Sequence, residues 1–202
     1  MITLKPEDLS TQDNYKLLVG SVIPRPIALV TTQSEEGLVN LAPFSFFNVV
    51  SSNPPVLSLS VQRMNGEMKD TARHLLATKE AVLHIVDQEN VAEANKTAAT
   101  LPAEMSELSV SNFETIPSDV VRVPAVKPAK ARYETTVLEY VPVKKEESVT
   151  ADFFLLEIKA YHLDETIYEA GRINPKTLGA VSRLAGDNYA EIGKLFSIAR
   201  PE

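Results

Sequence analysis

The chain has 202 residues, of which 44% are hydrophobic and 23% charged, and its formal net charge is −7. These proportions are ordinary for a globular protein, and the length favours one domain over residues 1–202. The acidic balance argues against a nucleic-acid partner, and the absence of cysteine excludes disulfides, thiolate nucleophiles and cysteine-bound metal sites.

The N-terminal residues MITLKPEDLS lack the basic start and apolar core of a signal peptide. No apolar run approaches the ~20 residues that a membrane-spanning helix needs. We therefore expect a cytoplasmic protein without a membrane partner.

The distribution of apolar residues predicts a mainly β chain with a few helices. Apolar residues three and four apart are typical of helices, whereas alternating or β-branched runs bounded by turn residues are typical of strands. The expected helices cover residues 11–19, 70–77 and 87–99. The expected strands cover residues 27–32, 39–42, 56–61, 81–86, 129–141 and 151–163. Neighbouring strands of this kind favour an antiparallel, closed or nearly closed barrel.

Residues 39–55, VNLAPFSFFNVVSSNPP, place hydrogen-bonding side chains beside three phenylalanines. A flat heterocycle with a polar rim needs this mixture, because apolar faces hold the ring and polar groups meet its edge. Pro43 has no N–H, so we expect it to end or bulge a strand and to free backbone groups for a ligand. The alternative is that the phenylalanines are core residues and the serines are turn residues.

Residues 63–71, RMNGEMKDT, resemble an anion cradle in their charge pattern. Asp70 or Thr71 is expected to cap the helix that follows, as Ser10 is expected to cap the first helix. Arg63 and Lys69 would add charged donors to the free N–H groups at the helix start. The alternative is a solvated loop with an ordinary helix cap.

The histidines His74, His84 and His162 are isolated, and no cluster of carboxylates is expected around them, so no metal site is predicted. The chain also has no GxSxG nucleophile elbow, no paired acid and base, no GxGxxG fingerprint and no GxxxxGK phosphate loop. No catalytic side chain is therefore assigned. A chain of this kind would take its reactivity from a cofactor.

Two sequence blocks, PRPIALVTT and NLAPFSFFN, followed by NPPVLSLSV and KDTARHLL, resemble the flavin reductase-like family of FMN-binding split barrels, and its flavoredoxin branch above all. The later segment PAKARYETTV and the tail RINPKTLGAVSRLAGDNYAEIGKLFSIARP are also similar to this family. The resemblance covers nearly the whole chain.

The resemblance implies a six-stranded antiparallel Greek-key split barrel that forms a homodimer and binds FMN at or near the subunit interface. It implies that FMN carries electrons from NAD(P)H to a flavin, a protein or a small molecule. The ring would lie along residues 40–47, and the phosphate near Ser60, Arg63, Lys69 and Thr71. The residues expected to bind the cofactor are Asn40, Leu41, Ala42, Pro43, Ser45, Phe46, Phe47, Asn48, Ser60, Arg63, Lys69 and Thr71.

One feature departs from the shorter flavin reductases, which carry a Gly-Asp-His motif in a late strand. The matching region here reads FFLLEIKAYHLDETIY, and His162 is present without the Gly-Asp pair. An electron carrier that takes electrons from a partner protein is therefore one alternative to an NAD(P)H-dependent enzyme. A non-catalytic barrel for a small ligand is another.

Overall fold

The computed structural model describes residues 1–201, and its largest feature is one antiparallel sheet of seven strands. The strand order is β3-β2-β6-β9-β10-β5-β4. The strands are β2 (Ala28–Gln33), β3 (Val39–Phe44), β4 (Phe47–Ser52), β5 (Pro55–Gln62), β6 (Glu80–Ile85), β9 (Ala131–Lys145) and β10 (Ser148–Leu163). The mainly β fold is confirmed, with seven strands in place of six, because β4 follows β3 as a separate strand.

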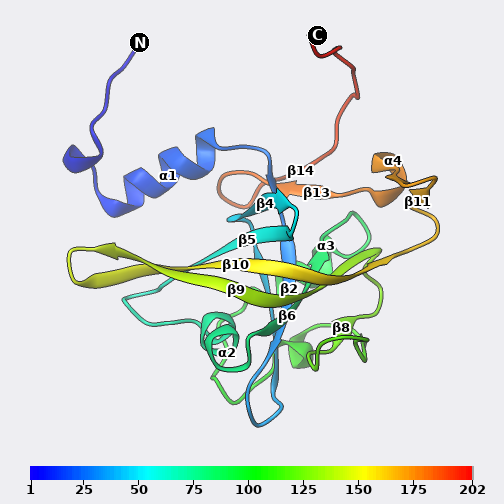
Figure 1. Cartoon of the computed structure of the whole chain (residues 1–202). Helices are drawn as coiled ribbons and strands as arrows, with labels where there is room; N and C mark the ends of the chain where they lie inside the picture. The colour runs from blue at the N-terminus through cyan, green and yellow to red at the C-terminus, as the bar shows by residue number, and fades with distance from the viewer. Residues whose placement is uncertain (202) are drawn as a thin grey trace.

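The two edge strands of this sheet, β3 and β4, are separated in the chain only by Ser45 and Phe46. A flat seven-stranded sheet would hold its edges roughly 29 Å apart, at ~4.8 Å for each neighbouring pair. The three Cα–Cα steps from Phe44 to Phe47 reach about 11 Å at most. The sheet therefore curls until its edges meet, which makes it a split barrel (Figure 1).

Apolar side chains fill the barrel and also cover part of its outside. The inner cluster contains Val30, Leu59, Leu83, Phe154 and Leu156, all fully buried. An outer cluster contains Ile27, Leu29, Leu41, Val86, Ala94, Val126 and Val181. Because β2 contributes to both clusters, both of its faces are buried, which explains its nearly continuous apolar sequence.

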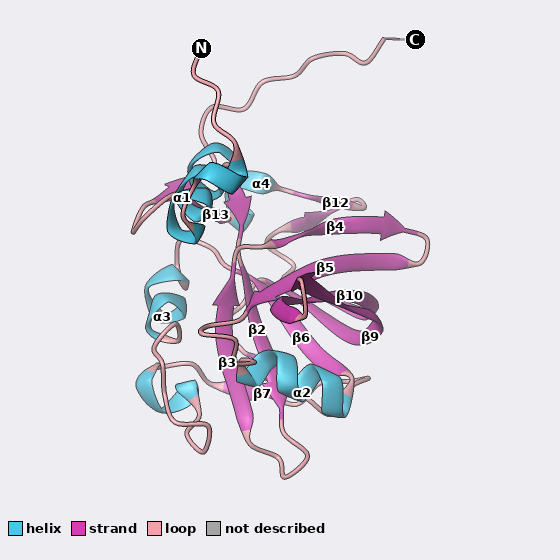
Figure 2. Cartoon of the chain, turned by 90° about the vertical axis from the view of Figure 1, so that its left-hand side faces the viewer, coloured by secondary structure: helices cyan, strands magenta, loops and turns pink. Residues whose placement is uncertain are grey.

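Helices lie at both ends of the barrel. They are α1 (Thr11–Ser21), α2 (Asp70–Thr78), α3 (Val91–Lys96) and α4 (Pro175–Leu178), with 3-10 turns at Pro6–Asp8 and Glu107–Val110. Figure 2 shows α1 at one end and α2 at the other. None of the helices in residues 1–201 has the length and apolar character needed to cross a membrane.

Two expected helix ends can be compared with the structure. Ser10 caps α1 as predicted, since its Oγ accepts the N–H of Asp13 at 3.0 Å. The helix expected over residues 87–99 was wrong in length, because α3 covers only Val91–Lys96. The Asp87 carboxylate accepts the N–H groups of Glu89 and Asn90 and holds these residues in a turn before the helix.

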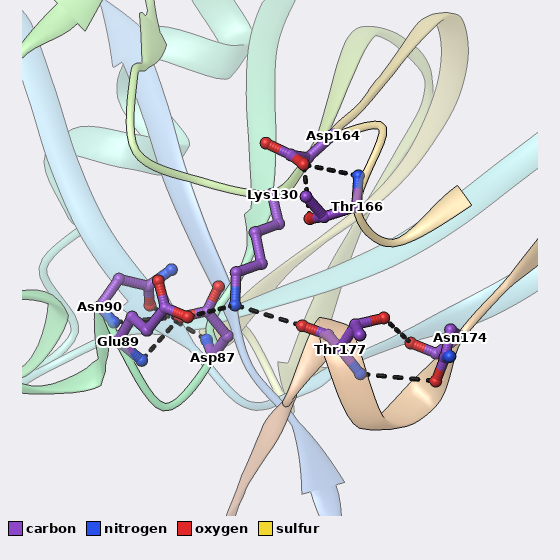
Figure 3. A network of polar contacts seen from close by, with 8 residues as sticks. All are labelled: Asp87, Glu89, Asn90, Lys130, Asp164, Thr166, Asn174 and Thr177. Atoms are coloured by element: carbon purple, nitrogen blue, oxygen red, sulfur yellow. Dashed lines mark hydrogen bonds and ion pairs between the residues drawn. The ribbon is translucent and has the colours of Figure 1, made fainter. Parts of the chain in front are cut away.

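Short strands, most of them in the C-terminal region, form three small sheets beside the barrel. They are β1 (Arg25–Pro26) with β13 (Val181–Arg183) and β14 (Tyr189–Glu191), β7 (Thr115–Ile116) with β8 (Ala125–Val126), and β11 (Tyr168–Glu169) with β12 (Arg172–Ile173). Lys130 joins this region to the barrel, since its Nζ lies 2.6 Å from Glu89 Oε1 and 3.2 Å from the carbonyl oxygen of Thr177 (Figure 3).

His84 is fully buried on β6 and has a partner at each ring nitrogen. Its Nδ1 lies 2.8 Å from the carbonyl oxygen of Leu29, and its Nε2 lies 2.8 Å from the backbone N of Val126. The Leu29 carbonyl can only accept and the Val126 N–H can only donate, so the ring is neutral with its proton on Nδ1. Burial lowers the pKa of His84 to about 4.

We predict that His84 makes the protein less stable as the pH falls from about 6.5 to about 4. The unfolded chain binds a proton at His84 below its ordinary pKa of about 6.5, whereas the folded chain binds it only near pH 4. The resulting decrease in the free energy of unfolding approaches roughly 3 kcal/mol at the lower pH. Urea unfolding of the wild type and of His84→Gln between pH 7 and 4 measures it. Parallel pH profiles for the two proteins would contradict this role of His84.

Candidate functional site

A cleft of about 260 Å³ opens between β3, the start of α2 and the segment that follows α3; we call it the α2 cleft. Its walls come from three parts of the chain that are far apart in sequence. Five of the predicted ligand-binding residues line it: Asn40, Ala42, Pro43, Lys69 and Thr71. The other lining residues are Phe44, Met64, Glu67, Met68, Asp70, Thr97, Ala98, Ala99, Thr100, Leu101 and Glu107.

Asn40 connects the edge strand β3 to the first turn of α2. Its Nδ2 donates to Thr71 Oγ1 at 2.9 Å and lies 3.4 Å from Thr32 Oγ1. Both Asn40 and Thr71 are buried, so these bonds are shielded from competition by water. The pair therefore fixes the start of α2 beside β3 and sets the width of the cleft.

The start of α2 has no side-chain cap. Lys69 occupies the N-cap position and its side chain forms no capping bond. The expectation that Asp70 or Thr71 caps this helix was wrong, because Asp70 pairs with Arg73 and the Thr71 hydroxyl bonds to Asn40. The first N–H groups of an α-helix have no intrahelical partner, and together with a lysine they form a site suited to an anion.

A second cleft, of about 380 Å³, lies at the other end of the barrel, where α1 approaches β4 and β5; we call it the β4 cleft. It shares no lining residue with the α2 cleft. Five more predicted residues line it: Ser45, Phe46, Phe47, Asn48 and Ser60. The structure thus separates the predicted residues into two groups, which line two different clefts.

Two predicted residues line neither cleft. Leu41 is fully buried in the outer apolar cluster. Arg63 forms a double hydrogen bond with Asp152, with Nε–Oδ2 and Nη2–Oδ1 distances of 2.9 Å. Tyr140 Oη also donates to Asp152 Oδ1 at 2.9 Å. The Arg63 guanidinium is therefore engaged in an ion pair with a fully buried carboxylate, and Lys69 is the predicted cation that reaches the α2 cleft.

The expected effect of Pro43 on the strand was wrong. β3 continues through Pro43, which pairs with Leu29, and ends at Phe44. A proline is tolerated there because β3 is an edge strand with one side free of sheet partners. The break in the ladder falls at Ser45 and Phe46, where the Phe46 carbonyl accepts the N–H of Ser60 at 2.9 Å.

Arg25, which the sequence reasoning missed, lines the β4 cleft while its head group is buried. Its Nη1 donates to the carbonyl oxygens of Val19 and Val22 at 2.7 Å, and Nη2 donates to that of Leu184 at 3.0 Å. Burial lowers its pKa. Arg25 therefore ties the end of α1 to the C-terminal region; its position between two prolines was the available sequence signal.

The expectation that no carboxylate surrounds the histidines was wrong for His162. Its Nε2 lies 2.6 Å from Glu134 Oε1, and its Nδ1 lies 3.9 Å from Asp119 Oδ2. These three side chains are close enough to share an ion. However, the buried Glu134 carboxylate already accepts the backbone N–H groups of residues 119–121 as well as His162. This group therefore anchors a loop to the barrel.

The comparisons with known proteins place these features in a family. The family model described as "Flavin reductase like domain" matches residues 19–177. Nitrilotriacetate monooxygenase component B from Bacillus cereus is 44% identical, with a TM-score of 0.96 over 98% of both chains. The 2-nitrobenzoate 2-nitroreductase of Pseudomonas fluorescens is 26% identical, with a TM-score of 0.88 over 99% of this chain and 96% of that one.

The flavoredoxin of Methanosarcina acetivorans shares the fold, with a TM-score of 0.77 at 18% identity over 98% of this chain and 96% of that one. The family expected from the sequence is thereby confirmed, and with it the split-barrel fold. The matched region includes both clefts except for part of α1. The chain belongs to the flavin reductase-like family of flavoproteins.

Proposed function

We propose that the chain is an oxidoreductase that binds FMN in the α2 cleft, with the phosphate at the start of α2. The observation that carries this proposal is the uncapped helix start beside Lys69, at a cleft whose β3 wall carries the apolar residues Ala42, Pro43 and Phe44. A flavin mononucleotide has one anionic end and one flat aromatic end, whose faces are apolar and whose rim is polar. The residues present fit such a group, because each end meets a suitable partner in one cleft.

The chain's own residues would bind and orient the cofactor. Lys69 and the first N–H groups of α2 would hold the phosphate, and Ala42, Pro43 and Phe44 would support the ring. When bound, FMN supplies the two-electron chemistry by which NAD(P)H can reduce a flavin, a protein or a small molecule. The side chains need to hold the ring and exclude water, and no acid or base among them is required.

The relatives support redox chemistry with more than one class of acceptor. One carries the name of a monooxygenase component and another that of a nitroreductase. A component of a larger enzyme implies a protein redox partner, whereas a nitroreductase acts on a small molecule. A nicotinamide donor is an intracellular reductant, so this proposal also places the protein in the cytoplasm.

We also propose that the chain forms a homodimer through the face around β4. This edge strand exposes Val49 and Val50, which are 72% and 50% accessible. Leu18 and Val22 of α1 are exposed beside it and line the β4 cleft. An uncharged edge strand next to an exposed apolar helix is a surface that other chains can cover.

The proposed function is tested by adding FMN to the purified protein and then adding NADH or NADPH without oxygen. We expect quenching of the flavin fluorescence on binding and bleaching of the flavin absorbance by a nicotinamide. Binding without bleaching would indicate an electron carrier that needs a partner protein. If FMN does not bind at all, the chain is a barrel for another ligand and the proposal is wrong.

We predict that Lys69→Ala weakens FMN binding about tenfold and leaves riboflavin binding within twofold, because only FMN carries the phosphate. Lys145→Ala, at the exposed end of β9, is the matched control for loss of one positive charge. Fluorescence titration measures both affinities. An equal loss for riboflavin would show that Lys69 does not act on the phosphate.

We predict that Val49→Lys converts a dimer into a monomer with the 22.2 kDa mass of one chain. A charge at this position would need to be desolvated in an interface that covers β4. Size-exclusion chromatography with light scattering measures the mass. Val120→Lys changes a similarly exposed valine on a loop outside β4 and should remain dimeric. A monomeric wild type would refute the proposed dimer.

A further inference from the structure

Glu107 is an acidic residue of the α2 cleft that the sequence reasoning did not select. It begins the 3-10 turn Glu107–Val110 and is only 8% exposed. Its Oε2 accepts the backbone N–H of Leu41 at 3.0 Å. Because β3 is an edge strand, this N–H has no strand partner, and the carboxylate satisfies it from the segment that covers the cleft.

Within the described part of the chain, the Glu107 carboxylate has no basic partner. Among residues 1–201, none of the ion pairs includes it. Burial raises the pKa of Glu107 and Asp70 raises it further, while the backbone N–H groups of Leu41 and Glu107 lower it. A carboxylate has about four acceptor positions. Two N–H groups occupy at most half of them, so acceptor capacity remains at the cleft.

A carboxylate with free acceptor positions determines which ligand groups can lie against it. An unpaired carboxylate repels a phosphate, and it gains no hydrogen bond from the apolar face of an aromatic ring. Hydroxyl groups are suitable, since each can donate one hydrogen bond to the carboxylate and remain uncharged. Glu107 is therefore suited to a ligand segment that carries hydroxyl groups and lies beyond the phosphate.

The position of Glu107 along the cleft agrees with this requirement. It bonds to Leu41, and the two neighbours of Leu41, Asn40 and Ala42, line the same cleft. Asn40 is bonded to Thr71 at the start of α2, whereas Ala42 leads to Pro43 and Phe44. Glu107 thus meets β3 between the end suited to a phosphate and the end suited to a ring.

We propose that Glu107 forms the subsite for the hydroxylated chain of the bound flavin, the ribityl group that joins ring and phosphate. This inference rests on the proposed binding of FMN in the α2 cleft. In this role Glu107 both accepts hydrogen bonds from the ribityl hydroxyls and holds the covering segment on β3. It favours flavins that carry a polyol over the bare ring.

Three flavins separate this role from a purely structural one. Lumiflavin has the ring alone, riboflavin adds the ribityl chain and FMN adds the phosphate. Glu107→Gln can keep its amide oxygen on the Leu41 N–H, but it turns a donor toward the cleft in place of an acceptor. We expect this variant to bind riboflavin and FMN about tenfold more weakly and lumiflavin within twofold of the wild type, by fluorescence titration.

Glu104→Gln, an exposed position three residues earlier in the same segment, is the control and should bind all three flavins normally. Circular dichroism checks the folding of each variant. If Glu107→Gln does not fold, Glu107→Asp keeps the charge but withdraws the carboxylate, and the same selective loss is expected.

The outcomes distinguish this inference from the proposed function. If the wild type binds FMN and Glu107→Gln binds each of the three flavins as tightly as the wild type does, the subsite is refuted and the proposed function stands. An equal loss for all three, lumiflavin included, would assign Glu107 a structural role only. A wild type that binds none of the three would overturn both proposals.

Discussion

The two-residue connection between β3 and β4 is the constraint on which this structure depends. It joins opposite edges of a seven-stranded sheet, so the sheet can exist only as a closed or nearly closed barrel. The same connection lies between the two clefts, because β3 lines the α2 cleft, whereas Ser45, Phe46 and the start of β4 line the β4 cleft. This two-residue connection therefore determines the fold and lies between the proposed cofactor site and the proposed dimer face.

The edge strand β3, which lies at this closure, has polar groups without strand partners. The α2 cleft is built from the elements that bond to these groups. On β3, Asn40 bonds to Thr71 of α2, and the Leu41 N–H bonds to Glu107. Both contacts bring polar segments against a strand whose other face belongs to a fully buried apolar cluster. The site thus arises because an edge strand needs partners, and those partners supply a helix start on one side and a carboxylate on the other.

Local patterns in the sequence were sufficient for most elements and for the family. The alternation of VLSLSV predicted β5, and Ser10 predicted the start of α1. The predictions that were wrong depended on contacts between residues that are distant in the sequence. The helix cap expected at Thr71 was lost because Asn40, 31 positions earlier, takes its hydroxyl. Glu134 lies within the strand expected over residues 129–141, and only the fold brings the N–H groups of residues 119–121 onto its carboxylate.

A contact between distant residues also decides which of the two predicted phosphate-binding cations reaches the α2 cleft. The sequence gives no reason to prefer Arg63 or Lys69 as the phosphate ligand. In the folded chain, Asp152, 89 positions after Arg63, binds the Arg63 guanidinium. Lys69 has no such ion pair among the described residues. It shares its cleft with Glu107, with Glu67 and with Asp70, which is paired to Arg73. One lysine and one helix start balance a single phosphate, whereas a diphosphate would place a second anionic group toward the Glu107 carboxylate. In the site proposed above, these charges would suit the single phosphate of FMN better than the diphosphate of FAD.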